Sequence, residues 1–266
     1  MEFFYKSDIW LNLSTWIILY VSFTFIGFAI FLKLTKGKLS EDSNEMVLTT
    51  FNLAGVIFSL IVTFVWVSLW TTWQTVDTNV GREADILATM YSQTHHMQEP
   101  YKANMRKSIK EYTYSVIHDE WPAMKKGNSS DKTLQAFMGL REHVHTMYDM
   151  PHDERYFYEI YFPLYRELTD LRRMRLHDTK KDLPASTWYV LFLFSFLTII
   201  SSFFYKMENL KIQFTMKLII AVMFAMSMFI CYDLDRPFRG DSAITSDALQ
   251  VLYDAQFNIS DVQLQH

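Results

Sequence analysis

The residues best placed to do chemistry follow the last long apolar segment, in the run from Tyr232 to Asp241. The candidate site residues are Asp233, Asp235, Arg236, Pro237, Phe238, Gly240 and Asp241. One hypothesis is a calcium site, because Ca²⁺ takes several carboxylate and carbonyl oxygens on an irregular loop. The spacing does not match the EF-hand pattern, and two arginines would oppose a bound cation. The alternative is a helix stop, in which Pro237 blocks continuation and Arg236 complements the helix dipole. The residues alone favour the stop.

Histidines form a second set of candidates, in the middle of the chain. They include the pair His95–His96, the pair His143 and His145, and His152 next to Asp153 and Glu154. Imidazole and carboxylate are zinc ligands, but this spacing fits no standard metal signature. With no phosphate-binding loop or nucleophile motif either, we expect no catalytic residue, no metal and no cofactor, with Ca²⁺ at the turn as the one alternative. A membrane enzyme with a His/Asp metal centre is the least favoured hypothesis.

The elements that must position these residues are four long apolar segments. Residues 13–31, 47–76 and 183–205 carry no formal charge, and a bilayer core needs roughly 20 apolar residues per helix. The fourth segment, 218–232, is shorter, and we expect Lys217 to snorkel from its end. The prediction is an all-α protein with four transmembrane helices in two hairpins and a helical cytosolic domain between spans two and three.

The segments divide the chain into four parts. We predict a first transmembrane hairpin at 1–76, a helical cytosolic domain at 77–182, a second hairpin at 183–233 and a cytosolic turn and helix at 234–266. An even number of spans places both termini and the middle domain on one side. Lys and Arg flanking the spans are more numerous on that side, which the positive-inside rule assigns to the cytoplasm. Charge in the middle segment is nearly balanced, so nucleic acid is not an expected partner.

The middle segment shows helical spacing throughout. We expect span two to continue as one helix through Tyr91, and a second helix from Pro100 to Trp121. Asp131 is the predicted N-cap of a third helix that Pro151 ends, and a fourth helix is expected to begin at Pro163.

One face of span two combines small, polar and aromatic side chains. At about 100° per residue a single stripe contains Asn52, Ser59, Thr63, Trp66 and Trp70. Such a stripe usually means close helix packing with interhelical hydrogen bonds, and the residues alone favour that interpretation. A pore lining is the alternative, in which hydrophobic rings gate by dewetting.

Several motifs together resemble a known family. They are Leu234–Gly240 after span four, Arg82–Ala84 after span two, Glu120–Trp121, and 168–176 with Leu183–Pro184 before span three. On these residues the chain is similar to the bestrophin-like family of bacterial four-helix membrane proteins. The resemblance implies distant kinship to bestrophin anion channels, which are pentamers with a pore lined by the second span and a cytosolic helical vestibule. Bestrophins also hold Ca²⁺ in a clasp around a Pro-Phe-Gly element, and the segment Asp235–Asp241 matches this element only in part.

Two function hypotheses of different classes remain. The leading one is an oligomeric anion channel of a bacterial inner membrane, with lipid, further copies of the chain and inorganic ions as partners. In it, Arg82, Arg172, Arg173 and Arg175 attract anions toward a cytosolic mouth, or act only as positive-inside anchors. The rival is a membrane-anchored structural or signalling module whose cytosolic helices bind a protein.

Overall fold

The computed structural model describes residues 2–35, 44–149, 155–207 and 209–258. Every regular element in these ranges is helical, which confirms the all-α prediction. The α-helices are α1 (Glu2–Thr35), α2 (Asn44–Gln93), α3 (Tyr101–Ser115), α4 (Trp121–Met124), α5 (Asp131–Thr146), α6 (Tyr156–Asp178), α7 (Ala185–Phe203), α8 (Leu210–Leu234) and α9 (Asp247–Leu252). Short 3₁₀ turns lie at Thr94–His96 and Met147–Asp149, and π-helical turns at Val116–Glu120 and Tyr253–Asn258.

The chain divides into two compact units, described separately here. The apolar unit contains Met1–Thr72, Asp182–Arg236 and Gly240–Ser242, and the polar unit contains Trp73–Lys181, Pro237–Arg239 and Ala243–His266. Four helices are long and apolar enough to cross a membrane by length and composition, in the ranges Ile9–Thr35, Asn44–His96, Ala185–Phe203 and Leu210–Leu234.

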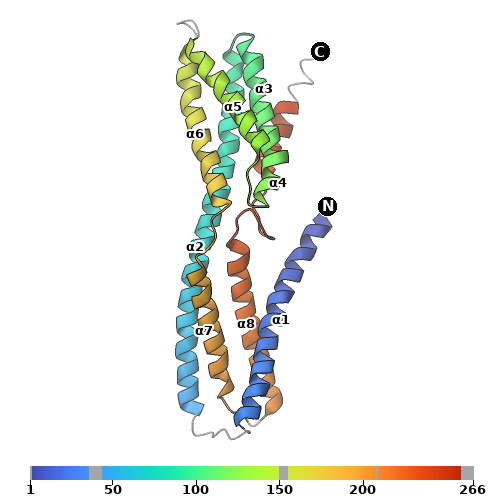
Figure 1. Ribbon diagram of the computed structural model, residues 1–266, viewed down its shortest axis with the longest axis vertical. Coiled ribbons are helices and arrows are strands. Elements are labelled where there is room, and N and C mark those ends of the chain that lie inside the picture. Colours follow the sequence, from blue (N-terminus) through green and yellow to red (C-terminus); the bar gives the residue numbers. More distant parts are fainter. Residues whose placement is uncertain (1, 36–43, 150–154, 208, 259–266) are drawn as a thin grey trace. The chain divides into compact units, whose positions relative to one another are not determined.

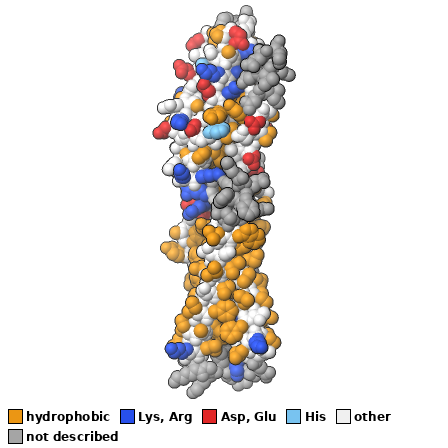
Figure 2. All heavy atoms as spheres, turned by 90° about the vertical axis from the view of Figure 1, so that its right-hand side faces the viewer, with side chains coloured by type: hydrophobic (Ala, Val, Ile, Leu, Met, Phe, Trp, Pro, Cys, Tyr) orange, Lys and Arg blue, Asp and Glu red, His pale blue; other side chains and the backbone are white. Residues whose placement is uncertain are grey.

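Helix α1 packs against α7 and α8 in the apolar unit (Figure 1). The Tyr20 and Ser195 hydroxyls lie 2.9 Å apart in a hydrogen bond between α1 and α7. Helix α2 joins this core through Phe58, whose ring centroid lies 4.5 Å from that of Phe224 on α8. Hydrophobic side chains dominate the unit's outer surface (Figure 2), which is the arrangement expected where the solvent is lipid.

The fourth apolar helix differs from the prediction. Helix α8 begins at Leu210 rather than near residue 218, because the Asn209 side chain caps it by accepting from the Lys211 and Ile212 amides. Lys217 therefore lies inside the helix, and its side chain is only 3 % exposed. The expectation that it snorkels from a helix end is wrong.

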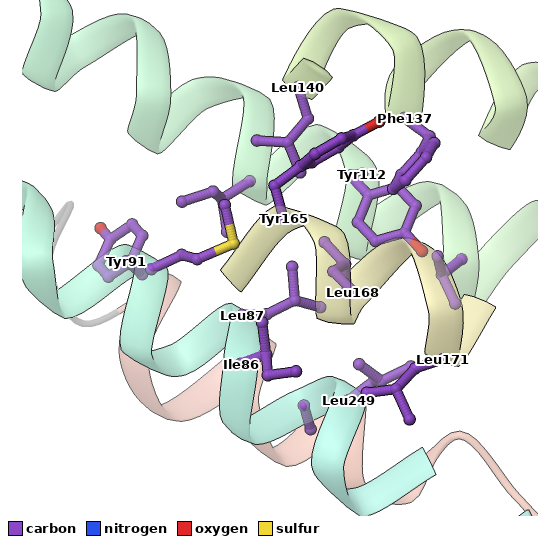
Figure 3. Close-up of a cluster of buried hydrophobic side chains, with 14 of the residues drawn as sticks. Ile86, Leu87, Tyr91, Tyr112, Phe137, Leu140, Tyr165, Leu168, Leu171 and Leu249 are labelled. Atoms are coloured by element: carbon purple, nitrogen blue, oxygen red, sulfur yellow. The ribbon is translucent and has the colours of Figure 1, made fainter. Parts of the chain in front are cut away.

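The polar unit is built around an apolar core shared by α2, α3, α5, α6 and α9. Figure 3 shows Leu87 of α2, Phe137 of α5, Leu168 of α6 and Leu249 of α9 directed into this core, where all four are buried. The ring of Tyr112 lies beside that of Phe137, with centroids 5.3 Å apart. The core explains why short helices with little intrinsic stability persist here, since packing supplies most of a helix's stability.

Helix boundaries in the polar unit follow the prediction in part. The continuation of span two past Tyr91 is confirmed, since α2 is one 50-residue helix. The cap of α5 is Ser130 rather than Asp131, with the Ser130 hydroxyl accepting from the Thr133 amide at 3.4 Å. Helix α6 begins at Tyr156, so Pro163 lies inside it, and the buried residues Phe157 and Tyr161 hold the turns before the proline. Pro151 lies outside the described residues.

Candidate functional site

The predicted stripe on α2 is exposed along its whole length. Asn52, Ser59, Thr63, Trp66 and Trp70 are all solvent-accessible within the single chain. The Ser59 hydroxyl donates to the Val56 carbonyl at 2.8 Å, and the Thr63 hydroxyl donates to the Ser59 carbonyl at 2.7 Å. The Trp66 and Trp70 rings stack with centroids 6.3 Å apart. The favoured interpretation, close packing of this stripe, is therefore wrong within one chain.

Three faces of α2 explain why the stripe stays exposed. Phe58, Val65 and Leu69 share the face that packs into the apolar unit. At about 100° per residue, the stripe lies on a second face. A third face presents exposed apolar side chains such as Leu60 and Phe64. The apolar third face can contact lipid, whereas the mixed polar and aromatic stripe is better matched to water or to another protein surface.

The turn after α8 uses its carboxylates as acceptors for backbone amides. Within the apolar unit, one Asp233 oxygen accepts from the amides of Asp241 and Ser242 at 3.1 and 3.4 Å. Gly240 makes this return possible, because its φ of +94° is a conformation that other residues rarely adopt. Asp241 in turn accepts from the side chain of Asn12 at 3.1 Å.

Asp235 closes the helix end. Its carboxylate accepts from the Leu183 amide at 2.6 Å, and burial raises the pKa of Asp235 despite that hydrogen bond. Arg236 lies 3.6 Å from a carboxylate oxygen of Asp182, so it makes an exposed ion pair. In the described part of the chain no group of three or more His, Cys, Asp and Glu side chains could hold a metal ion. This geometry fits the helix-stop interpretation. The sequence also suggested that a residue of 241–245 caps the last helix, but the N-cap of α9 is Ser246.

The remaining residues of the turn belong to the polar unit. Phe238 is buried, and its ring meets that of Trp121 edge to face with centroids 5.8 Å apart. The Pro237 carbonyl accepts from the Ile244 amide at 2.8 Å, while the Ile244 carbonyl accepts from the Trp121 indole at 3.2 Å. Pro237 and Phe238 therefore anchor the segment leading to α9.

The polar unit also contains a buried ion-pair network that the sequence analysis did not predict. Arg175 of α6 donates to both oxygens of Glu83 of α2, through Nε at 2.8 Å and Nη2 at 3.0 Å. The same Nη2 donates to Glu120 at 2.9 Å. Arg175 is 2 % exposed, and both glutamates are fully buried. The network links three segments that are far apart in sequence.

A second arginine completes the network. Arg172 Nη2 donates to the other Glu120 oxygen at 2.6 Å, so two guanidinium groups face two carboxylates. The Tyr112 hydroxyl donates to Glu83 at 2.8 Å. Burial and the adjacent Glu83 charge raise the pKa of Tyr112, which keeps the phenol protonated as a donor. Burial alone would lower the pKa of Arg175, but the two glutamates more than offset it and the pKa lies above its ordinary value.

A wide helical turn places Glu120 in the network. Helix α3 passes into the π-helical turn Val116–Glu120, and α4 begins with Trp121 and Pro122. Proline has no backbone N–H, so a regular α-helical hydrogen bond is lost at this point. The indole ring of Trp121 covers the Arg175 guanidinium at 5.2 Å, and the Phe137 ring covers that of Arg172 at 5.1 Å.

The four arginines proposed to attract anions each have a carboxylate partner. Besides the two buried residues, Arg82 pairs with Glu167 and Arg173 pairs with Asp170. The attraction hypothesis is thus wrong for Arg172 and Arg175. The sequence contains a signal for this, because Arg172 and Arg175 each lie four residues after a buried leucine of α6, Leu168 and Leu171 respectively.

Comparisons with known proteins agree with this architecture. A family model described as Bestrophin-like domain matches residues 18–249. Three solved structures of variants of a bacterial Bestrophin homolog from Klebsiella pneumoniae have the same fold, with TM-scores of 0.71, 0.69 and 0.68. Their identities to this chain are 11, 10 and 10 %, and the alignments cover 91, 93 and 94 % of this chain and 96, 98 and 99 % of theirs. No curated protein matches the sequence.

The buried ion-pair network is expected to contribute to the free energy of unfolding. Replacing Arg175 by Met should lower the free energy of unfolding by about 3–5 kcal/mol, because Glu83 would remain buried without its partner. The measurement is guanidinium unfolding of the detergent-solubilised protein followed by tryptophan fluorescence. Arg173→Met is the matched control, since it removes an exposed pair on the same helix and should change little. Equal losses in both variants would contradict the assignment.

The positive φ of Gly240 in the turn after α8 leads to a second prediction about stability. Gly240→Ala should cost about 1–2 kcal/mol, because alanine is disfavoured at positive φ and its Cβ would lie 3.2 Å from the Asp233 carboxylate. Gly139→Ala in α5 is the control: no atom lies within 4 Å of an added Cβ there, and a helical alanine should gain up to about 1 kcal/mol. The same unfolding assay measures both. Stabilisation by the first change would overturn the role given to Gly240.

Proposed function

Since the chain belongs to the Bestrophin-like family, we propose that it forms a homo-oligomeric channel in a bacterial inner membrane and passes anions. The four apolar helices are its membrane-embedded part. The second span, the first part of α2, lies next to the pore, and its Asn52, Ser59, Thr63, Trp66 and Trp70 stripe lines the ion path.

The observation that carries this proposal is the exposure of the stripe. Exposure to lipid would be unfavourable above all for the Asn52 amide, because it would lose its interactions with water. Ser59 and Thr63 already donate to carbonyls of their own helix. Assembly of several copies around an axis lets each α2 keep its Phe58 face packed in its own chain and turn the stripe toward a central path. Lipid then contacts only the face that contains Leu60 and Phe64.

The span lacks the acidic rings of many cation channels and also contains no Lys or Arg, so the preference for anions rests on the resemblance to bestrophin anion channels. Cation channels commonly use rings of Asp or Glu to select their ions. The segment 47–76 contains no carboxylate, and its stripe offers hydroxyl, amide and indole groups instead. Trp66 and Trp70 would form the narrowest part of the path, where hydrophobic rings restrict wetting.

We also propose a membrane topology for the channel. The spans form two hairpins, and the polar unit, both termini and the turn after α8 face the cytoplasm. The excess of Lys and Arg beside the spans on that side supports this orientation. The network around Arg175 then stabilises a cytosolic helical region rather than supplying free charge to attract ions.

The direct test is ion flux from the purified protein in liposomes, with chloride and potassium measured separately and the mass of the detergent complex determined in parallel. Chloride flux from a defined oligomer is the expected result. A folded monomer, or an oligomer that passes neither ion, would refute the channel and favour the membrane-anchored module whose helices bind a protein partner.

A pair of variants tests the assignment of the stripe. Trp66→Ala should raise the single-channel conductance about twofold or more, because it removes a bulky ring from the path. Phe64→Ala is the matched control, since this aromatic side chain is two residues away and 74 % exposed, but on the apolar face. Equal effects of the two changes, or no effect of either, would remove the stripe from the pore.

A further inference from the structure

The apolar unit contains a buried cation that the channel proposal does not use. Lys217 lies seven residues after the start of α8, or about 10 Å along the helix. Its side chain is 3 % exposed. An ionisable side chain within a membrane segment is costly and usually has a function.

Among the described residues, the partners of this ammonium group are all uncharged. Its nitrogen donates to the Ser202 carbonyl at 2.7 Å and lies 4.4 Å from the centre of the Phe28 ring and 5.5 Å from that of Phe203. The Ser202 carbonyl, at the end of α7, also accepts from the Tyr205 amide at 3.4 Å, while the Lys206 amide donates to the Asn44 side chain. In the part of the chain that the structure describes, Lys217 makes no ion pair with a carboxylate.

Lys217 also lines a cavity of about 250 Å³ between the beginning of α2 and the α7–α8 connection. Most of the wall is apolar, with Val47, Leu48 and Phe51 of α2 opposite Met216 and Ile220 of α8. Two side-chain amides fix the wall: Asn44 exchanges hydrogen bonds with the Lys206 backbone, and Gln213 donates to the Tyr205 carbonyl at 2.7 Å.

We propose that this cavity binds a long-chain fatty acid whose carboxylate pairs with Lys217. The lysine supplies the positive charge, and the apolar wall accommodates methylene groups. A fatty acid fits better than a phospholipid, because a cavity of about 250 Å³ can hold a carboxyl end with part of a single chain. A phospholipid would bring a larger headgroup and two chains. The proposal does not depend on conduction, because binding at Lys217 can be measured without ion flux.

The test uses the full chain in phosphatidylcholine nanodiscs, with oleate labelled with carbon-13 at its carboxyl group as the probe. The expected result is a shifted carboxyl resonance for one oleate per chain and a higher melting temperature with oleate. Lys217→Met should weaken binding about tenfold or more, since a charge-assisted bond is lost. This variant is expected to fold, because an apolar replacement of a buried charge is often tolerated.

Two further variants distinguish the contribution of the Lys217 charge from that of the cavity volume. Lys211→Met removes an exposed cation on the same helix and should leave oleate binding unchanged. Leu48→Trp should obstruct the cavity and weaken binding while Lys217 is retained. Oleate binding that is equal in wild type and Lys217→Met, or that is absent from both, would overturn the proposal. So would stabilisation through Lys217 by chloride or phosphate alone, or displacement of oleate by phosphatidylglycerol.

Discussion

The contact between Arg175 and Glu83 is the interaction on which the polar unit depends. It joins α6 to α2 through two parallel hydrogen bonds, and Glu120 brings in the turn between α3 and α4. A buried arginine loses its hydration, so the pair is favourable only when every donor has a partner and the charges balance. Two arginines facing two glutamates meet the second condition. The neighbouring Tyr112 hydroxyl and the Trp121 ring supply further contacts.

Glu83 also reveals a constraint on α2 as a whole. The buried residues Phe58, Leu69, Val76 and Val80 precede it, and Leu87 follows it, at separations that keep one face of a regular helix. One packing face thus continues along the 50-residue helix, although its chemistry changes from purely apolar to ionic. Ser59 and Trp66 lie on a different face of α2, which no helix of the same chain covers among the described residues, so they are exposed.

Much of the fold could be predicted from the sequence. Uninterrupted apolar segments and helical spacing were enough for the all-α class and for the long continuation of α2 past Tyr91. The errors have local causes: Asn209 starts α8 earlier than hydropathy indicates, and packing around Phe157 overrides the usual meaning of Pro163. The stripe of α2 could be found from its spacing, but spacing does not decide which face meets a neighbour. The ion-pair network was missed because charged residues were assigned to solvent, although Arg172 and Arg175 continue the buried face of α6.

Arg175 and Lys217, two of the buried cations among the described residues, show what charge compensation requires. Arg175 is enclosed by carboxylates of its own chain, and its planar group directs its N–H donors to fixed acceptors. Lys217 is buried to the same degree, but a carbonyl and two phenylalanine rings are all that the described residues offer it. Carbonyl dipoles and ring faces stabilise a cation without neutralising it. The first site is therefore complete within the chain, whereas the second has space beside it and a positive charge that an anion would balance. That difference is the physical reason to seek a ligand at Lys217 and none at Arg175.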